Sequence, residues 1–371
     1  MMPVNALFPE PKQSRTGPLG WSEPAVHWFT DSTRPEAGAS RDAVNSWYAE
    51  FPDGDAKFAA RLTSRVDVDH YQALDELYVH HLLRQCHGDV RYEEGGIGPD
   101  FRIYDDGILV GGVEVLSLFQ REDWRAEQAL HSRLATELNK RVRPTDGYFV
   151  DFDIEHAEQE PAPRPFADWI RVQLAGLPPH DQLFLPPDVT RVDLPARVYD
   201  RDGVRIQVTF LPMRKDAPTK SSPDGRIVGM GPVIGGMVNS GARLKDRIEA
   251  KAGGRYQIGE VPFLVAAGVH DIFCSDVEVI SAVYGSDAMD LRTGELVRSP
   301  DGLFGTDPQR GHGRHRRVSA VAAISHLRVW EAKTAEIAVL HNPNAAQPWP
   351  DHALPTTRRF GHPANTGATR A

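Results

Sequence analysis

The chain has 371 residues, of which 40% are hydrophobic and 25% charged, and its formal net charge is −9 with histidine neutral. These values are typical of a folded globular protein and argue against a disordered chain and against a general nucleic-acid coat protein, although they allow a local basic groove. No run of residues reaches the roughly 18–20 apolar positions of a membrane helix, and residues 1–20 lack the apolar core of a signal peptide. The cysteines, Cys86 and Cys274, have no CxxC spacing, which disfavours a disulfide framework or a thiolate zinc site. We therefore expect a cytoplasmic protein without membrane contact.

Composition divides the chain into three parts. Residues 1–45 are rich in proline and show little periodicity, so we expect an extended arm there. Residues 343–371 are again rich in proline and are expected to form a loose tail. Residues 46–342 should form one ordered domain, and no repeat of fixed period is present in the sequence.

The first part of this domain is predicted to be a helix followed by three strands. Apolar residues at helical spacing predict a helix over 71–85, and Asp69 with Gln72 has the pattern of a capping box at its start. Strands are predicted over 90–93, 101–104 and 110–118. The dipeptides Gly95-Gly96 and Asp106-Gly107 indicate the turns between them, and the second is a hairpin signal.

The rest of the chain alternates between helices and strands. Helices are predicted over 122–141, 166–175, 242–252 and 275–284. Strands are predicted over 148–154, 261–267, 318–324 and 337–340. Alternating apolar residues over 196–213 predict a hairpin that turns at Asp202-Gly203, and 216–241 is expected to be a long loop rich in Gly, Pro and Ser.

A carboxylate stands in the middle of the apolar strand predicted over 110–118. Glu114 lies between Val113 and Val115, so its side chain points to the opposite face of the strand from theirs. A carboxylate among apolar residues is costly unless it is paired or binds a cation. Asp100 begins the preceding strand, and two carboxylates on neighbouring strands are typical of a Mg²⁺ site, where the ion can activate water and neutralise a phosphodiester.

Each acid also has an explanation that involves no metal. Asp100 could cap a turn or pair with an arginine, and Glu114 could form a buried salt bridge. Glu76, on the preceding helix, could be an ordinary solvated helix residue.

This order of elements resembles the PD-(D/E)XK nuclease superfamily, which has the restriction-endonuclease-like fold: a helix comes first, Pro-Asp begins one strand, and Glu lies in the next strand. The resemblance is carried by Leu74-Asp75-Glu76-Leu77, Pro99-Asp100 and Val113-Glu114-Val115. The stretch 250–266 is similar to the helix and strand that complete such a core. The ending 340–345 resembles a bacterial branch of this layout that lacks the motif lysine.

This resemblance implies that Asp100 and Glu114 bind Mg²⁺ or Mn²⁺ and that Glu76 is the additional acid that many members place near the metal. The motif lysine should follow the glutamate by two residues, where this chain has Leu116. Some members supply that lysine from a nearby helix, and Lys251 is the candidate here. Without such a replacement, the protein would bind metal or nucleic acid without cutting it.

Basic residues recur along one predicted helix. Arg243, Arg247 and Lys251 stand four residues apart, and Arg255, with Tyr256 beside it, continues the interval. Like charges on one helix face repel each other by roughly 0.2–0.5 kcal/mol per pair, and a nucleic-acid phosphate backbone alongside would relieve this repulsion. The row could equally be the solvated edge of an ordinary amphipathic helix.

A second basic segment, over 310–317, combines arginines with glycines and contains Arg314 and Arg316. Such a segment could hold nucleic-acid phosphates. It could equally be a solvated loop that balances an acidic body.

We therefore predict an α/β protein of the restriction-endonuclease-like type, with a mixed central sheet flanked by helices. The core is assigned to 70–118 and 240–268, with 120–235 as a large insertion; alternatively, the helix over 122–141 supplies the core and the later half is a separate lobe. The expected function is that of a Mg²⁺-dependent nuclease acting on nucleic acid, with DNA as the expected substrate. The alternatives are a catalytically inactive nucleic-acid-binding or regulatory protein on the same scaffold and an interaction protein unrelated to nucleic acid. A homo-oligomer or a protein partner is compatible with each of them.

Overall fold

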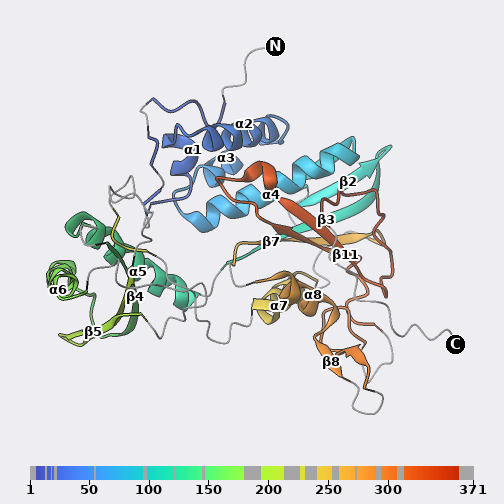
Figure 1. Ribbon diagram of the computed structural model, residues 1–371. Coiled ribbons are helices and arrows are strands. Elements are labelled where there is room, and N and C mark those ends of the chain that lie inside the picture. Colours follow the sequence, from blue (N-terminus) through green and yellow to red (C-terminus); the bar gives the residue numbers. More distant parts are fainter. Residues whose placement is uncertain are drawn as a thin grey trace. The chain divides into compact units, whose positions relative to one another are not determined.

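The computed structural model describes most of the chain (Figure 1). The described residues are 6–12, 15–17, 19–20, 23–53, 56–94, 98–119, 122–143, 147–178, 194–212, 226–229, 240–252, 259–271, 274–289, 294–306 and 313–358. The chain divides into two compact units. Unit 1 contains Met1–Thr16, Pro24–Gln120 and Val238–Ala371, and unit 2 contains Gly17–Glu23 and Arg121–Met237. The main segment of unit 2, Arg121–Met237, nearly coincides with the insertion predicted over 120–235.

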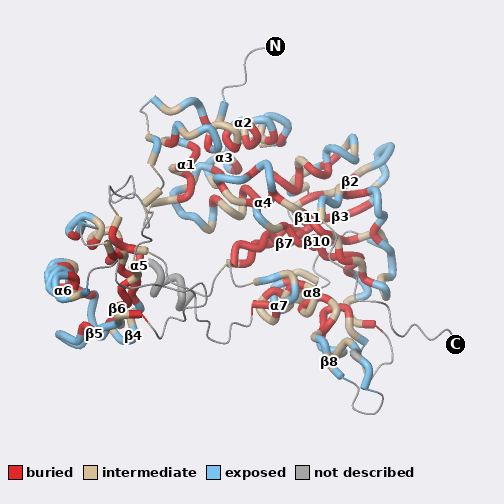
Figure 2. The backbone as a smooth tube through the Cα atoms, in the orientation of Figure 1, coloured by how far each residue is buried: buried red, intermediate tan, exposed pale blue. Residues whose placement is uncertain are grey.

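Unit 1 is built on a six-stranded mixed sheet with the order β1-β2-β3-β7-β10-β11. The strands are β1 (Asp89–Tyr92), β2 (Phe101–Asp105), β3 (Ile108–Leu118), β7 (Phe263–Val269), β10 (Ala320–Ser325) and β11 (Glu336–His341). β7 lies between β3 and β10 and is parallel to both, whereas the other neighbours are antiparallel. Every residue of β7 is buried, which explains its continuous apolar sequence (Figure 2).

Helices cover both faces of this sheet. The α7 (Ser240–Ala252) and α8 (Asp276–Tyr284) helices pack on one face, where Leu244 and Ile248 of α7 join Leu116 and Leu118 of β3 in one apolar core. The α4 helix (Asp67–Cys86) lies against β1, β3 and β7. Its Asp75 bonds with Ser117, which alternates with Leu116 and Leu118 along β3, so α4 covers the opposite face. The predicted α/β fold with a mixed central sheet flanked by helices is therefore confirmed.

Most local predictions in unit 1 match the observed elements, and one helix start was wrong. Asp106 and Gly107 have positive φ angles of 47° and 78° and form the predicted turn between β2 and β3. The α4 helix, however, begins at Asp67 with Val66 at its N-cap, and no side chain caps it. Asp69 therefore lies inside the first turn, where its negative charge is favourable next to the positive end of the helix dipole. The turn predicted at Gly95-Gly96 lies outside the described residues.

The extended arm expected over 1–45 is wrong from His27 onward, where helices begin, whereas the described residues before His27 form no helix or strand. The helices are α1 (His27–Asp31), α2 (Pro35–Ala49) and α3 (Lys57–Leu62). The prolines of this segment end at Pro35, which occupies the first turn of α2, where its missing N–H costs nothing. Trp47 of α2 is buried and packs against Tyr78 of α4 at a ring-centroid distance of 5.3 Å, which anchors the segment to α4.

The C-terminal segment is also attached to unit 1 as far as residue 358. Trp349 and Leu354 are buried, and Thr357 donates its backbone N–H to the carbonyl of Ile337 in β11. The loose tail expected over 343–371 therefore does not begin at 343, and 359–371 lie outside the described residues. A short 3-10 helix, η3 (Ala332–Thr334), and a hairpin of β8 (Asp287–Met289) and β9 (Leu296–Arg298) complete unit 1.

Unit 2 has a core of its own, formed by a three-stranded sheet and two helices. The strand order is β4-β6-β5, with β4 (Tyr148–Ala157), β6 (Val204–Pro212) and β5 (Ala196–Arg201). The predicted hairpin turns at Asp202 and Gly203, both with positive φ. The α5 (Glu122–Arg141) and α6 (Pro163–Ala175) helices pack against each other, and α5 also contacts β4, so α5 belongs to this core. The long loop predicted over 216–241 lies mostly outside the described residues.

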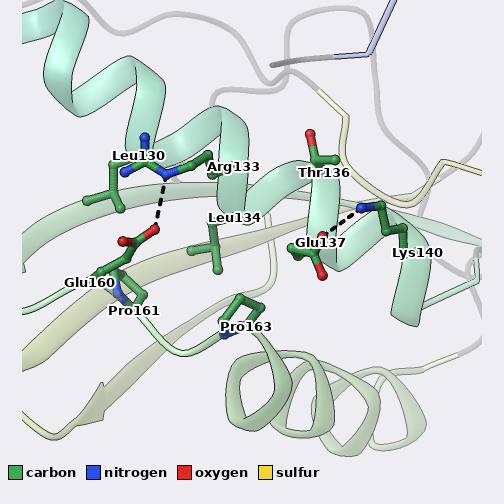
Figure 3. A pocket seen from close by; sticks show the side chains of 9 residues that line it. All are labelled: Leu130, Arg133, Leu134, Thr136, Glu137, Lys140, Glu160, Pro161 and Pro163. Carbon is green, nitrogen blue, oxygen red and sulfur yellow. Dashed lines mark hydrogen bonds and ion pairs between the residues drawn. The ribbon is translucent and has the colours of Figure 1, made fainter. Parts of the chain in front are cut away.

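A groove of about 240 Å³ lies on unit 2 between α5 and the chain that enters α6 (Figure 3). Its charged side chains pair with one another, because Arg133 bonds to Glu160 at 3.0 Å and Lys140 bonds to Glu137 at 2.7 Å. In each of these two pairs the positive and the negative charge cancel, so the pairs add no net charge to the groove. Among the described residues of both units, no helix has the length and apolarity to cross a membrane.

Candidate metal centre

The two acids predicted to bind metal come together at the junction of β2 and β3. Phe101, the first residue of β2, pairs with Val113 of β3, so Asp100 lies just before β2 and beside the position of Glu114. The charges of Glu114 and Glu76 both act on the carboxyl group of Asp100, so the three acids lie close together. Asp100 is held in place by β3, since its Oδ2 accepts a hydrogen bond from the backbone N–H of Val115 at 2.6 Å.

Glu114 is buried and forms an ion pair with the candidate lysine. Its residue is 3% exposed, and its Oε1 lies 2.5 Å from Nζ of Lys251, in the last turn of α7. The Lys251 side chain is 33% exposed and therefore links the buried carboxylate to solvent. The contact brings the predicted glutamate and the predicted lysine together. It is also the buried salt bridge that the explanation without metal requires.

Asp100 is the member of this cluster whose charge is least favoured. Burial and the nearby carboxylates of Glu114 and Glu76 together raise the pKa of Asp100 to about 8, against smaller lowering effects of the Val115 hydrogen bond and of Lys251. Glu114 forms an ion pair with Lys251, and Glu76 forms one with Arg61. Asp100 forms no ion pair with the described residues. The cluster therefore holds three acids and two cations, and a further positive charge beside Asp100 would be stabilising.

Glu76 is buried and engaged, not solvated. It is 8% exposed, and both of its carboxylate oxygens accept hydrogen bonds from Arg61 of α3 at 2.6 and 3.0 Å. The hydroxyl of Tyr92, on β1, donates to the same carboxylate at 2.8 Å. The alternative of a solvated helix residue is therefore wrong, and Glu76 lies near Asp100, whose pKa it raises.

Leu116, at the position of the motif lysine, is part of the apolar core. It is 6% exposed and packs in the cluster that includes Leu244 and Ile248 of α7. Leu116 and Glu114 are two residues apart and share one face of β3. The same helix, α7, thus covers Leu116 with apolar side chains and supplies Lys251 to Glu114 one turn beyond them.

The two arginines of the basic row on α7 form hydrogen bonds at the end of β3. Arg243 donates to Oδ2 of Asp271 at 3.1 Å and to the carbonyl of Phe119 at 2.6 Å. Arg247 donates to the carbonyl of Ser117 at 3.0 Å. These contacts satisfy backbone groups where β3 ends and so give both arginines a structural role.

The remaining residues predicted to bind nucleic acid lie in or beside loops. Arg314 is half-buried, and Arg316 is exposed with its Nε donating to the carbonyl of Asn344 at 3.3 Å. Arg255 and Tyr256 lie outside the described residues. Asn342, in the ending 340–345, donates to the carbonyl of Val318 at 2.8 Å, so this ending ties β11 to the segment before β10.

A buried polar network on the α4 face of the sheet was not predicted. Asp75 of α4 accepts hydrogen bonds at Oδ2 from the hydroxyl of Ser117 and, at 2.8 Å, from Nε2 of His270. Asp75 lies so close to β7 that a Cβ atom at Gly268 would come within 1.9 Å of its Oδ2. The signal in the sequence was the glycine inside an apolar strand, which indicates close approach of another group.

The donor chemistry of Asp100 and Glu114 fits a hard divalent cation. Proteins commonly bind Mg²⁺ through one or two carboxylates, and water and substrate oxygens complete the shell. Among the described residues, no group of three or more His, Cys, Asp and Glu side chains is arranged to hold a metal ion. A metal here would therefore be held by Asp100 and Glu114 together with solvent or substrate oxygens.

Comparisons of the chain with protein-family models, with curated proteins and with solved structures find no match.

Proposed function

We propose that this protein is a Mg²⁺-dependent nuclease of the PD-(D/E)XK type that hydrolyses phosphodiester bonds of nucleic acid. The observation that carries the proposal is the meeting of Asp100, Glu114 and Lys251 at one point of the sheet. Two acids from adjacent strands and a lysine from a distant helix are the groups that such a reaction needs. The elevated pKa of Asp100 supports the proposal further, because perturbed acids cluster at functional sites.

In this proposal, Asp100 and Glu114 would hold the metal ion, which would supply charge neutralisation at the scissile phosphate and a lowered pKa of water. Val115 keeps Asp100 oriented through its backbone N–H. Lys251 exchanges its contact with Glu114 for a contact with the substrate, and its charge then stabilises the negative charge that develops on the phosphoryl group. Its position in the last turn of α7, one-third exposed, leaves the ammonium able to make this exchange.

The nucleic acid, which we propose to be DNA, would be held by basic side chains. Arg314, which is half-buried, and Arg316, which is exposed, are proposed to contact the phosphates together with Arg255 and Tyr256. Arg243 and Arg247 would contribute positive potential from their positions at the end of β3. Both cysteines are free thiols, which supports placement in the reducing cytoplasm.

The alternative function is a catalytically inactive nucleic-acid-binding or regulatory protein on the same scaffold. It is favoured by two observations: Leu116 replaces the motif lysine, and Lys251 already pairs with Glu114. A structural salt bridge of this kind would need no metal.

A cleavage assay with Glu114→Gln separates the two functions. The purified chain is incubated with labelled single- and double-stranded DNA and RNA, with Mg²⁺ or Mn²⁺ and with EDTA. The nuclease proposal expects metal-dependent cleavage that Glu114→Gln abolishes while circular dichroism shows an unchanged fold. Cleavage that survives in Glu114→Gln would refute the site, and binding of nucleic acid without any cleavage would favour the alternative.

A further inference from the structure

The carboxylate of Glu76 is clamped by side chains from two other elements. Arg61, on α3, donates through Nη2 to Oε1 at 2.6 Å and through Nη1 to Oε2 at 3.0 Å. Tyr92, on β1, donates its hydroxyl to Oε2 at 2.8 Å. Both oxygens of Glu76 therefore accept hydrogen bonds, and two of the three bonds carry the charge of a guanidinium.

Arg61 and Tyr92 also contact each other and nearby aromatic rings. Nη1 of Arg61 also donates to the hydroxyl of Tyr92 at 3.2 Å, and its guanidinium carbon lies 5.9 Å from the ring centroid of Phe58. The ring of Tyr92 packs against Phe51 at 4.9 Å and against Phe58 at 5.7 Å. The two donors to Glu76 are thus themselves packed on aromatic rings, which orients them toward its carboxylate.

This clamp lies beside the candidate metal centre. Tyr92 pairs with Phe101, the residue that follows Asp100, across the β1–β2 register. The negative charge of Glu76 acts on Asp100, where it disfavours the ionised carboxylate. Arg61, which is 36% exposed at its side chain, offsets part of that charge.

We infer that Arg61 and Tyr92 are positioning residues that keep Glu76 as an outer carboxylate of the metal centre, so that Glu76 acts on the metal through its charge and not as a ligand. This inference rests on the proposed function. Direct coordination would require Glu76 to break its bidentate pair with Arg61, whereas its charge reaches the centre with the pair intact.

The test measures Mn²⁺ binding to the full-length chain by titration calorimetry, independently of cleavage. Arg61→Gln removes the offsetting charge and the bidentate pair from Glu76, while Tyr92 still donates to Oε2, so we expect Mn²⁺ to bind about 3–10-fold more tightly while cleavage becomes slower. A merely structural role of Arg61 would weaken both. Arg61→Lys keeps the charge without the bidentate geometry and should fall between the wild type and Arg61→Gln in both measurements.

Arg133→Gln is the matched control, because Arg133 forms an exposed ion pair with Glu160 at 3.0 Å in unit 2. This variant should leave the Mn²⁺ affinity unchanged. Glu76→Gln, which removes the charge itself, should weaken Mn²⁺ binding several-fold. The inference is overturned if folded Arg61→Gln binds Mn²⁺ no more tightly than the wild type. Should that variant not fold, unchanged affinity in Glu76→Gln overturns it.

Glu114→Gln in the same titration distinguishes this inference from the proposed function. Loss of Mn²⁺ binding in Glu114→Gln, together with unchanged binding in Arg61→Gln, refutes the clamp alone. If the wild type binds no Mn²⁺, or binds it equally well in Glu114→Gln, both the metal centre and the clamp are refuted.

Discussion

Nζ of Lys251 lies 2.5 Å from Oε1 of Glu114, although 137 positions separate the two residues in the chain. The pair joins the end of α7 to the middle of β3, and the carboxylate is almost fully buried. A buried acid of this kind must be neutralised by a partner. Lys251 is the partner of Glu114 in the absence of metal. The proposed function requires Glu114 to bind a metal ion in place of Lys251.

Replacement of this lysine should separate stability from metal binding. We expect Lys251→Met to destabilise the metal-free protein by about 2–4 kcal/mol, because it leaves the carboxylate of Glu114 buried without this cation. Added Mn²⁺ should then raise the melting temperature more in Lys251→Met than in the wild type, since the metal no longer competes with the ammonium. Cleavage should be lost. Thermal melts with and without Mn²⁺ measure both effects.

Lys245→Met, on the same helix, is the control for that comparison, because Lys245 donates to the carbonyl of Asp301 at 2.6 Å and not to Glu114. It should show no extra response to Mn²⁺. Equal metal responses in Lys245→Met and Lys251→Met would contradict the exchange of lysine for metal.

Replacement of Asp100 should stabilise the protein while removing metal binding. The pKa of Asp100 rises to about 8 in the folded state, mainly because of burial and then because of Glu114 and Glu76. The folded state then binds more protons than the unfolded state, so this residue lowers stability as the pH rises from about 4 to about 8. Asp100→Asn removes that cost and can still accept the bond from Val115, so we expect a gain of about 1–2 kcal/mol at pH 7.

Urea unfolding of Asp100→Asn at pH 4 and pH 7 measures this gain, which should be near zero at the lower pH. Asp105→Asn, at an exposed position of β2, should show no comparable pH-dependent gain. A loss of stability at pH 7 in Asp100→Asn would mean that the aspartate stabilises the fold and would argue against a strained metal-binding acid.

Gly268 should tolerate no side chain. A Cβ atom there would lie 1.9 Å from Oδ2 of Asp75, which accepts bonds from Ser117 and His270. Gly268→Ala should therefore cost about 3 kcal/mol or more, because it disrupts a buried hydrogen-bond network as well as packing. Gly88→Ala, whose Cβ would meet nothing within 4 Å, should change stability little. Chemical denaturation of both variants gives the comparison, and similar stabilities would disprove the close approach of α4 to β7.

Buried histidines should make the fold sensitive to acid. Burial lowers the pKa of His70 to about 4, and Nδ1 of its ring bonds to the carbonyl of Leu62 at 2.6 Å. The unfolded state then binds more protons between about pH 4 and 6.5, so the contribution of His70 is complete above pH 6.5 and is lost as the pH falls. The loss is at most about 1.4 kcal/mol per pH unit. Burial lowers the pKa of His80 to about 4 as well, so both contribute.

His70→Asn retains a donor for the carbonyl of Leu62 but does not titrate. The free energy of unfolding should therefore depend less steeply on pH between 6.5 and 4.5 in His70→Asn than in the wild type. Equal slopes in the two proteins would show that His70 is not held neutral by the fold.

Local signals in the sequence were sufficient for most elements. The α5 helix occupies the predicted range because its apolar spacing is helical throughout. Asp106-Gly107 and Asp202-Gly203 form turns because Asp and Gly accept the positive φ angles that these turns require. The α2 helix was missed because the prolines before Pro35 dominated the composition of the segment. Its stability comes from contacts such as that of Trp47 with Tyr78, which join distant parts of the chain.

The sequence by itself determined the α/β class, the order of helices and strands along the chain, and the hairpin of β2 and β3, which brings Asp100 near Glu114 because the turn that joins the two strands is local. Only the tertiary structure decided which cation meets each acid. Lys251 reaches Glu114 from α7, and Arg61 reaches Glu76 from α3, by packing of helices against the sheet. Periodicity and turn residues act over a few positions, whereas the partner of a buried charge depends on which helices share its face of the sheet.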